Sequence, residues 1–448
     1  MTYSAFNDPT LAFDTQQLHA GYDPSEHFRA KTVPIYQTAA FELGDFERCE
    51  RLFSHEEEGD SYVRSSNPTN RVVESRIAAL EGGAAALTMG SGMAAISNTF
   101  LNLACAGDRI AAVKSLYGGS TSLLADVLPD YGICTDWIKD PDDLDAYRDA
   151  ITDQTKAVYI EALGNPGANI VDIEAVAGIA HEHGIPLVMD ATFATPYLLQ
   201  GFDFGVDIVC HSATKYLAGH GTTISGIVVE KGGFDWRNGN FPQFERFLDE
   251  NDGTIEAESL RLTAFTRRLR MRFLTQFGAH MSPWNAFLVL QGLETLSLRM
   301  RRHADNALRV AIFLESHPGV REVAYPSLPS SPYHDRASKY FPRGSGAVLG
   351  VRVEGGLEGA KRVLERVRIF DHLTNVGDTK SLIVHPATSI HHGLPPAAQA
   401  DAGVYPDTLR ISVGTEHADD LIADLDQALS RLTSMPASRA ASQGEPPT

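Results

Sequence analysis

The stretch Val206-Asp-Ile-Val-Cys-His-Ser-Ala-Thr-Lys-Tyr216 begins as an apolar strand and ends in Ser212, Thr214 and Lys215. Around it, from about residue 84 to residue 230, short apolar runs alternate with amphipathic stretches. This alternation is typical of an α/β fold with a mainly parallel central sheet covered by helices on both faces. Such sheets bind ligands at the carboxyl ends of their strands. We therefore expect two hydroxyls and an amine at the ligand-binding edge.

Lys215 is the residue of this stretch with the most reactive side chain. For an isolated lysine, an exposed loop charge is the simpler interpretation. Here the neighbouring hydroxyls can bind an anion, and a partly desolvated amine can condense with an aldehyde, as Schiff-base lysines do. The stretch favours this carbonyl chemistry.

A second apolar strand, Ile185-Pro-Leu-Val-Met-Asp190, ends in a carboxylate. A carboxylate at a buried strand end needs a partner, and it can supply a counter-charge to the pyridinium nitrogen of pyridoxal phosphate (PLP). A turn-forming or helix-capping aspartate is the alternative. Because Lys215 follows nearby in the sequence, the two motifs together favour the cofactor.

A third motif, Leu87-Thr-Met-Gly-Ser-Gly-Met-Ala-Ala95, leads from a strand through small residues into a helix. Free backbone N–H groups and the helix dipole make such a turn a phosphate-binding site. The motif also matches the dinucleotide pattern G-x-G-x-x-A, which requires an acid about 20 residues further on, near the end of the next strand. That strand, Arg109–Val113, leads into Lys114 instead. The motif therefore favours a phosphate of another cofactor over NAD.

Four further side chains are candidates for ligand binding. Tyr117 follows the next strand and could lie flat on a cofactor ring, unless it is only part of a turn. Tyr62 and Arg64 could clamp an anion by charge-assisted hydrogen bonds, or be ordinary surface loop residues. Arg410 is a cation in the apolar strand Thr408–Val413, where it could bind a carboxylate or form an ion pair with a buried acid.

Composition disfavours several classes of function. The formal net charge of −19 disfavours a nucleic-acid-binding surface. The first residues lack an apolar run preceded by basic residues, which predicts neither a signal peptide nor a membrane anchor, and we expect a cytoplasmic protein. The four cysteines form no CxxC pair and are expected to be buried, reduced thiols. His181, His183, His391 and His392 lack the i, i+4 spacing of a helical zinc site, so we expect solvated histidines and no metal.

The chain is predicted to divide into an N-terminal arm over residues 1–60, a large domain over 61–275, a smaller C-terminal domain over 276–435 and a disordered tail over 436–448. A polar insert with aromatic residues, 231–272, interrupts the alternation of strands and helices at the end of the large domain.

Five motifs, in their order along the chain, resemble those of the Cys/Met-metabolism family of PLP enzymes. They are SGMAAI (91–96), SLYGG (115–119), TPYL (195–198), HSATKY (211–216) and LRISVG (409–414). The resemblance extends from His19-Ala-Gly21 to the final helix. It implies PLP-dependent transferase fold type I, of the aspartate aminotransferase type, with a smaller C-terminal α/β domain.

The resemblance also implies a role for each candidate residue. Lys215 would hold PLP as a Schiff base and act as a catalytic residue, Tyr117 would stack on the ring and take part in catalysis, and Asp190 would contact the pyridine nitrogen. The other implied cofactor-binding residues of the same subunit are Ser91, Gly92, Met93, Thr192, Ser212 and Thr214. Tyr62 and Arg64 would reach the cofactor phosphate of a neighbouring subunit, which implies at least a dimer, and the family is usually tetrameric.

The implied substrate-binding residues are Asn165, near the cofactor oxygen, and Arg410, which would bind the substrate carboxylate together with the backbone near Asn375. Within the family, the closest resemblance is to the O-acetylhomoserine sulfhydrylases. Its features are Glu161-Ala-Leu-Gly-Asn-Pro-Gly167, the insert with Gly233-Phe-Asp-Trp236 and Asn240-Phe-Pro242, and Asn375-Val-Gly-Asp-Thr-Lys-Ser-Leu382. Met93 and Ala191 depart from the usual glutamine and asparagine, which concerns the preferred substrate rather than the cofactor.

This resemblance implies γ-replacement on O-acetyl-L-homoserine, in which sulfide or methanethiol replaces acetate to give L-homocysteine or L-methionine. A C–S lyase of the methionine γ-lyase or cystathionine lyase type, and a cystathionine γ-synthase, are alternatives that use the same residues. A catalytically idle binding protein on the same fold is the alternative from another class. The expected partners are small-molecule substrates and further copies of this chain.

Overall fold

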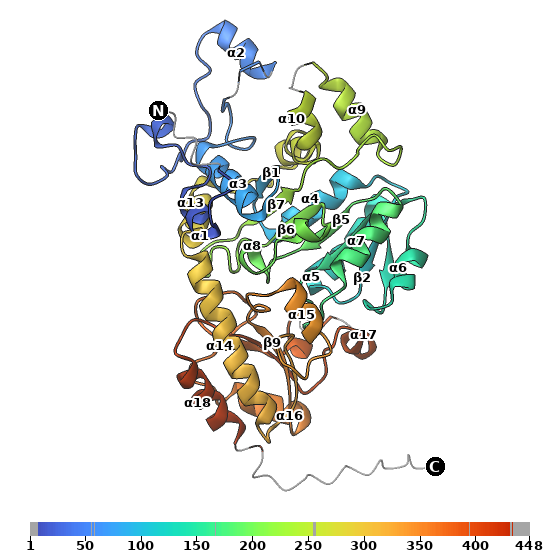
Figure 1. Ribbon diagram of the computed structural model, residues 1–448, viewed down its shortest axis with the longest axis vertical. Helices are drawn as coiled ribbons and strands as arrows, with labels where there is room; N and C mark the ends of the chain where they lie inside the picture. Colours follow the sequence, from blue (N-terminus) through green and yellow to red (C-terminus); the bar gives the residue numbers. More distant parts are fainter. Residues whose placement is uncertain are drawn as a thin grey trace, which may run out of the picture.

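The computed structural model describes residues 8–54, 56–57, 59–165, 167–253, 257–393, 395–430 and 432. The tail predicted over 436–448 lies outside the described residues. The described chain forms a seven-stranded sheet and a five-stranded sheet. The long helix α14 (Leu296–Ser316) follows the larger sheet in the chain and runs along the smaller one (Figure 1).

The larger sheet has the strand order β1-β7-β6-β5-β4-β2-β3. The pairs from β6 through β5, β4 and β2 to β3 are all parallel, whereas β7 is antiparallel to both β6 and β1. The mainly parallel sheet is therefore confirmed. The strands are β1 (Ala85–Met89), β2 (Arg109–Val113), β3 (Cys134–Ile138), β4 (Thr155–Glu161), β5 (Leu187–Asp190), β6 (Ile208–His211) and β7 (Gly226–Glu230).

Helices cover the larger sheet, and this explains the apolar sequences of its central strands. Every residue of β4 is buried, and because successive side chains point to opposite faces, both faces of the sheet must be covered. Helices α3, α4 and α7 all contact its strands. The helices up to the end of this sheet are α1 (Phe13–His19), α2 (Phe46–Phe53), α3 (Pro68–Glu81), α4 (Gly92–Leu103), α5 (Gly118–Ser122), α6 (Leu144–Ala150), α7 (Ile173–Glu182) and α8 (Thr195–Leu198).

The smaller sheet has the order β10-β11-β12-β9-β8 and is antiparallel except between β10 and β11. Its strands are β8 (Val320–Ala324), β9 (Val348–Val353), β10 (Asp371–His372), β11 (Leu382–Val384) and β12 (Thr408–Ser412). The helices of this part are α15 (His334–Tyr340), α16 (Gly356–Leu364), α17 (Pro396–Asp401) and α18 (Ala418–Leu429). The exact domain boundaries stay a prediction.

The insert between the two sheets carries a buried aromatic cluster. Trp236 is 3% exposed and stacks on Phe244, with ring centroids 4.1 Å apart, and Phe241 and Phe265 pack against it. This cluster is part of the core, which explains why a polar segment contains so many aromatic residues. The helices of the insert and after it are α9 (Pro242–Glu250), α10 (Ala257–Leu262), α11 (Ala264–Arg268), α12 (Thr275–Phe277) and α13 (Pro283–Leu293).

Two expectations about cysteines and histidines were partly wrong. The cysteines are free, but only Cys210 is buried, whereas Cys105 and Cys134 are exposed because they lie in a loop and at an edge strand. His391 is buried rather than solvated, whereas His181, His183 and His392 are exposed as expected, and His181 pairs with Asp207 at 2.8 Å. Among the described residues, no helix combines the length and apolar character needed to cross a bilayer.

Candidate active site

The strand ends of the larger sheet and residues of the smaller sheet enclose a cavity of about 350 Å³. Glu161 and Asp190 end the neighbouring strands β4 and β5, and the loop with Lys215 follows β6. Arg410 on β12 contributes from the other sheet. The cavity thus lies at the carboxyl edge of a parallel sheet, where such folds bind ligands.

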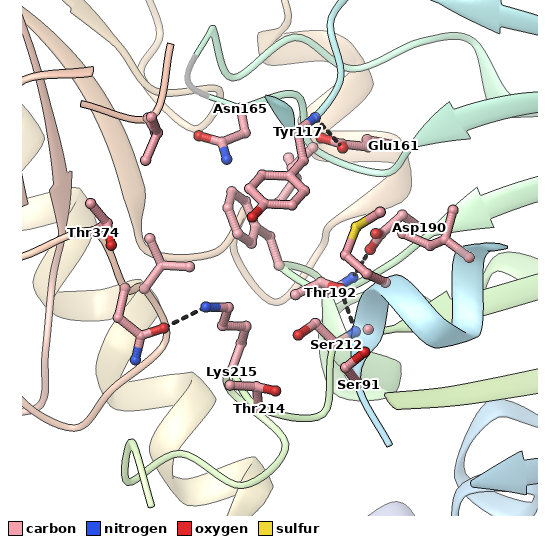
Figure 2. A pocket seen from close by; sticks show the side chains of 18 of the residues that line it. Ser91, Tyr117, Glu161, Asn165, Asp190, Thr192, Ser212, Thr214, Lys215 and Thr374 are labelled. Carbon is pink, nitrogen blue, oxygen red and sulfur yellow. Dashed lines mark hydrogen bonds between the residues drawn. The ribbon is translucent and has the colours of Figure 1, made fainter. Parts of the chain in front are cut away.

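The cavity brings together all predicted site residues except Tyr62 and Arg64, and Figure 2 shows most of them. The predicted residues that line it are Ser91, Gly92, Met93, Tyr117, Asn165, Asp190, Thr192, Ser212, Thr214, Lys215, Asn375 and Arg410. Tyr62 is 48% exposed, and the Arg64 guanidinium lies 5.4 Å from the centre of its ring. A role of this pair in a neighbouring subunit stays a prediction.

Lys215 faces the cavity rather than bulk solvent, so it is not a surface loop lysine. Its Nζ donates a hydrogen bond to the side-chain oxygen of Asn375 (Figure 2). Burial, and then the positive charge of Arg410, lower the pKa of the Lys215 amine to about 8. A larger share of this amine is neutral near physiological pH than for an exposed lysine, and the neutral amine is the nucleophile that condenses with an aldehyde.

Asp190 and Thr192 connect the loops that follow β5 and β6 at the cavity. Its Oδ1 accepts a hydrogen bond from the Thr192 N–H at 2.8 Å, and the Thr192 Oγ1 accepts one from the Ser212 N–H at 2.8 Å. Burial raises the pKa of Asp190, and the hydrogen bonds from Thr192 oppose this rise. Asp190 therefore makes the turn that was the alternative interpretation, and it also presents a carboxyl group to the cavity.

The turn before α4 has the features of a phosphate-binding site. Ser91 caps the helix, with its Oγ accepting from the Ala94 N–H at 3.0 Å. A Cβ atom at Gly92 would lie 2.6 Å from Cβ of Ser212, so only glycine lets these segments approach so closely. The N–H groups of the first helical turn lie next to the Ser212 hydroxyl, and both are donors for an anion.

Arg410 and Asn165 have unused hydrogen-bonding capacity. Arg410 is 3% exposed, and its Nη2 donates to the carbonyl oxygens of Thr374 at 2.7 Å and Asn375 at 3.3 Å. No carboxylate of the described residues lies within ion-pair distance of it, which leaves the predicted alternative of a structural ion pair unsupported. The buried side-chain oxygen of Asn165 likewise has no partner among the described residues.

These residues fit PLP group by group. The amine of Lys215 suits the aldehyde, the half-buried carboxyl group of Asp190 suits the pyridine nitrogen, and the turn at Gly92 with Ser212 suits the phosphate. Figure 2 shows the Tyr117 ring projecting into the same space. Thr214 uses its hydroxyl within the protein, donating to the Ser225 carbonyl and accepting from the Ser225 N–H.

Sequence reasoning missed several residues of the cavity wall. Glu161 was the detectable one, because it ends an apolar strand in the same way as Asp190. The other missed residues are Ile96, Leu163, Phe193, Ile224, Thr374, Val376 and Ile390. Most of them are apolar, and no local pattern separates them from core residues.

Comparison with known proteins agrees with this geometry. Residues 14–430 match the family described as Cys/Met metabolism PLP-dependent enzyme. The chain belongs to that family. It is a PLP-dependent enzyme of fold type I, with the two sheets described above.

Members of this Cys/Met family are similar to the chain over nearly its whole length. A homocysteine synthase of Schizosaccharomyces pombe is 44% identical, and the match covers 93% of this chain and 98% of that protein. An O-acetyl-L-homoserine sulfhydrylase of Leptospira meyeri is 42% identical, with 94% and 97% covered. A crystal structure from Campylobacter jejuni, described as an O-acetylhomoserine (thiol)-lyase, superposes with a TM-score of 0.89 at 38% identity and covers 94% of this chain and 100% of that one. It contains N'-pyridoxyl-lysine-5'-monophosphate.

Proposed function

We propose that this enzyme catalyses γ-replacement on O-acetyl-L-homoserine, with sulfide or methanethiol as the incoming nucleophile. The products are L-homocysteine or L-methionine, and acetate. The observation that carries the proposal is a cavity with Lys215, Asp190 and Arg410 in an enzyme whose relatives, 44% and 42% identical, are named homocysteine synthase and O-acetyl-L-homoserine sulfhydrylase. The alternatives, a C–S lyase that breaks down methionine or cystathionine and a cystathionine γ-synthase, use the same residues, but the names of the relatives described above refer to homocysteine or O-acetylhomoserine and not to those reactions.

Lys215 is the proposed anchor and base. Bound PLP supplies an electron sink that stabilises negative charge on the substrate carbons next to the amino group. The Lys215 amine takes the proton from the α-carbon and then moves a proton from the β-carbon, which allows acetate to leave from the γ-carbon. Asp190 provides the negative charge that keeps the pyridine nitrogen protonated.

Arg410 is the proposed ligand of the substrate carboxylate. Its Nη2 is already oriented by two carbonyl oxygens, so the remaining guanidinium donors are available without reorganisation. Lys215 and Arg410 are the cationic side chains that line the cavity in the described part of this chain. A succinyl ester would bring a second carboxylate without a matching cation there, which supports the acetyl ester.

The active form is proposed to be a cytoplasmic homo-oligomer, a tetramer in which active sites are shared across a dimer interface. Helix α2 of the N-terminal arm projects away from both sheets (Figure 1), and its Phe46 and Phe53 are 80% and 67% exposed. Large exposed aromatic side chains are typical of interaction surfaces. In this arrangement Tyr62 and Arg64 would bind the cofactor phosphate of the adjacent subunit, and residues 61–275 and 276–435 would form the two domains.

The test is product analysis with protein reconstituted with PLP. O-acetyl-L-homoserine is supplied with sulfide, methanethiol, cysteine or no nucleophile. We expect homocysteine with sulfide and methionine with methanethiol, and neither in the variant Lys215→Ala. Release of 2-oxobutyrate at the same rate without a nucleophile would identify a lyase, and efficient formation of cystathionine from cysteine would identify a γ-synthase.

A further inference from the structure

Glu161, which is buried, and Asp190, which is half-buried, form a pair of carboxyl groups on neighbouring strands. They are register partners in the parallel pair β4 and β5, so their side chains leave the sheet on the same face. The Ala162 N–H still donates to the Asp190 carbonyl at 2.9 Å, which shows that the strands stay paired at this point. Both side chains line the cavity, and Glu161 is 7% exposed.

The two carboxyl groups have unequal surroundings. Asp190 accepts from Thr192 and lies near His211, and both interactions favour its ionised form. Glu161 accepts from one backbone N–H, that of Tyr117, and no cation of the described residues lies within ion-pair distance of it. Two adjacent carboxylates away from water cannot both ionise easily. Glu161 is therefore the member of the pair that holds a proton.

The electrostatics of the site agree with this assignment. Burial, and then the charge of Asp190, raise the pKa of Glu161 well above its usual range. Among the residues that the structure describes, the other ionisable group that interacts with Glu161 is Tyr159 on the same strand, and burial keeps Tyr159 neutral by raising its pKa.

Through its hydrogen bond with the Tyr117 backbone, Glu161 holds the residue that carries an aromatic ring at the cavity. The Tyr117 N–H donates to Glu161 Oε1 at 2.6 Å (Figure 2), at the start of the five-residue helix α5. A Cβ atom at Gly119 would lie 2.5 Å from the Tyr117 ring, so the ring folds back over this glycine. A helix this short has little stability of its own, so the position of the Tyr117 ring depends on the hydrogen bond from the Tyr117 N–H to Glu161.

We propose that Glu161 is a positioning residue that, as a neutral acid, holds the Tyr117 backbone and so keeps the aromatic ring against the cofactor beside ionised Asp190. This inference rests on the proposed placement of Tyr117 over the PLP ring. It does not depend on which homoserine ester reacts.

The experiment compares Glu161→Gln and Glu161→Leu in the PLP-loaded enzyme. The readouts are the visible circular dichroism of bound PLP, which reports the seating of the ring, and the pH midpoint of its absorbance. Glu161→Leu should lose most of the dichroism and lower kcat/KM roughly tenfold, because the Tyr117 N–H loses its acceptor. Glu161→Gln should recover the dichroism that Glu161→Leu loses and keep the wild-type midpoint, since its amide is neutral and keeps an acceptor oxygen.

Glu230→Gln is the matched control. Glu230 is also buried at a strand end and accepts from the N–H groups of Phe265 and Thr266, but it does not line the cavity. Loss of this carboxylate should lower thermal stability without changing the dichroism of bound PLP.

Two outcomes would overturn the inference. A shifted pH midpoint in Glu161→Gln would show that Glu161 acts as a charged group, and full dichroism in Glu161→Leu would show that the anchor is unnecessary. If Glu161→Leu does not fold, the pH midpoint of PLP absorbance in Glu161→Gln still tests whether Glu161 is neutral. Unchanged dichroism in Tyr117→Leu would instead refute the placement of Tyr117 over the ring, and product formation tests the proposed reaction separately.

Discussion

The Lys215 amine donates a hydrogen bond to the side-chain oxygen of Asn375, and this bond joins the two sheets at the reactive centre. Lys215 follows β6 of the larger sheet, whereas Asn375 lies between β10 and β11 of the smaller sheet. The lysine is therefore oriented before any ligand binds, and its protonation state depends on residues from both sheets.

The rate of PLP uptake by the apoenzyme should depend on pH through Lys215. Because the pKa of this amine is lowered to about 8, its neutral, nucleophilic form should increase as the pH rises and approach saturation above about pH 8. Absorbance of the protein-bound cofactor, followed after mixing at a series of pH values, measures this rate.

The pH at which PLP uptake reaches half its maximal rate should be higher in Arg410→Gln than in the wild type. The substitution removes a positive charge that lowers the pKa of Lys215. Arg148→Gln, at an exposed position that does not line the cavity, is the control. A midpoint that stays in place in Arg410→Gln would show that burial alone sets the pKa.

Arg410→Lys should reduce kcat/KM for O-acetyl-L-homoserine. A lysine keeps the charge but cannot keep both carbonyl contacts and also bind a carboxylate through two parallel hydrogen bonds. Loss of a charge-assisted hydrogen bond of about 2 kcal/mol corresponds to a loss of roughly 30-fold. Steady-state kinetics and PLP titration measure the effect, and unchanged kinetics would place the carboxylate elsewhere.

Gly92→Ala should weaken PLP binding at least about tenfold. The new methyl group would lie 2.6 Å from Cβ of Ser212 and force the phosphate-binding turn apart. Gly178→Ala is the control, because Gly178 lies within α7 and a Cβ atom there meets nothing within 4 Å. Fluorescence titration of the apoenzymes compares the affinities, and equal affinity of both variants would argue against a phosphate at Gly92.

Hybrid oligomers should test whether Tyr62 and Arg64 act in a neighbouring subunit. Lys215→Ala and Arg64→Ala are each expected to be nearly inactive. After dissociation and reassociation of an equal mixture, about half of the dimers are hybrid and one of their two sites is intact, so activity should return to about a quarter of wild type. A mixture that stays inactive after confirmed subunit exchange would indicate that Arg64 acts in the site of its own subunit and not in that of its neighbour.

The sequence predicted the parts of the fold that have a strong local signal. Strand β5 ends at Asp190 as expected, and the strand expected at Arg109–Val113 is β2. Strand β3 was missed, since it lies at the sheet edge and its half-exposed sequence mixes polar and apolar residues.

The candidate site was predictable wherever a polar residue lies within an apolar strand, ends it or follows it closely. Asp190, Lys215 and Arg410 have this signal, and they line one cavity. Ile390 and Thr374 have no such signal, because only the packing of the two sheets brings them there. His391 was expected to be solvated but is buried.

The exposed cysteines Cys105 and Cys134 offer a convenient handle for labelling. Cys134 starts β3 opposite Arg109 at the start of β2, so this end of the larger sheet is remote from the carboxyl edge that holds the cavity. Cys210 is buried, and burial raises the pKa of its thiol to about 12, so it reacts poorly with thiol reagents. Cys49 of α2 is also free and partly exposed, so it has to be replaced by serine first. In that Cys49→Ser protein, maleimide dyes should attach selectively on the far side of the molecule, where they can report subunit exchange by energy transfer without disturbing catalysis.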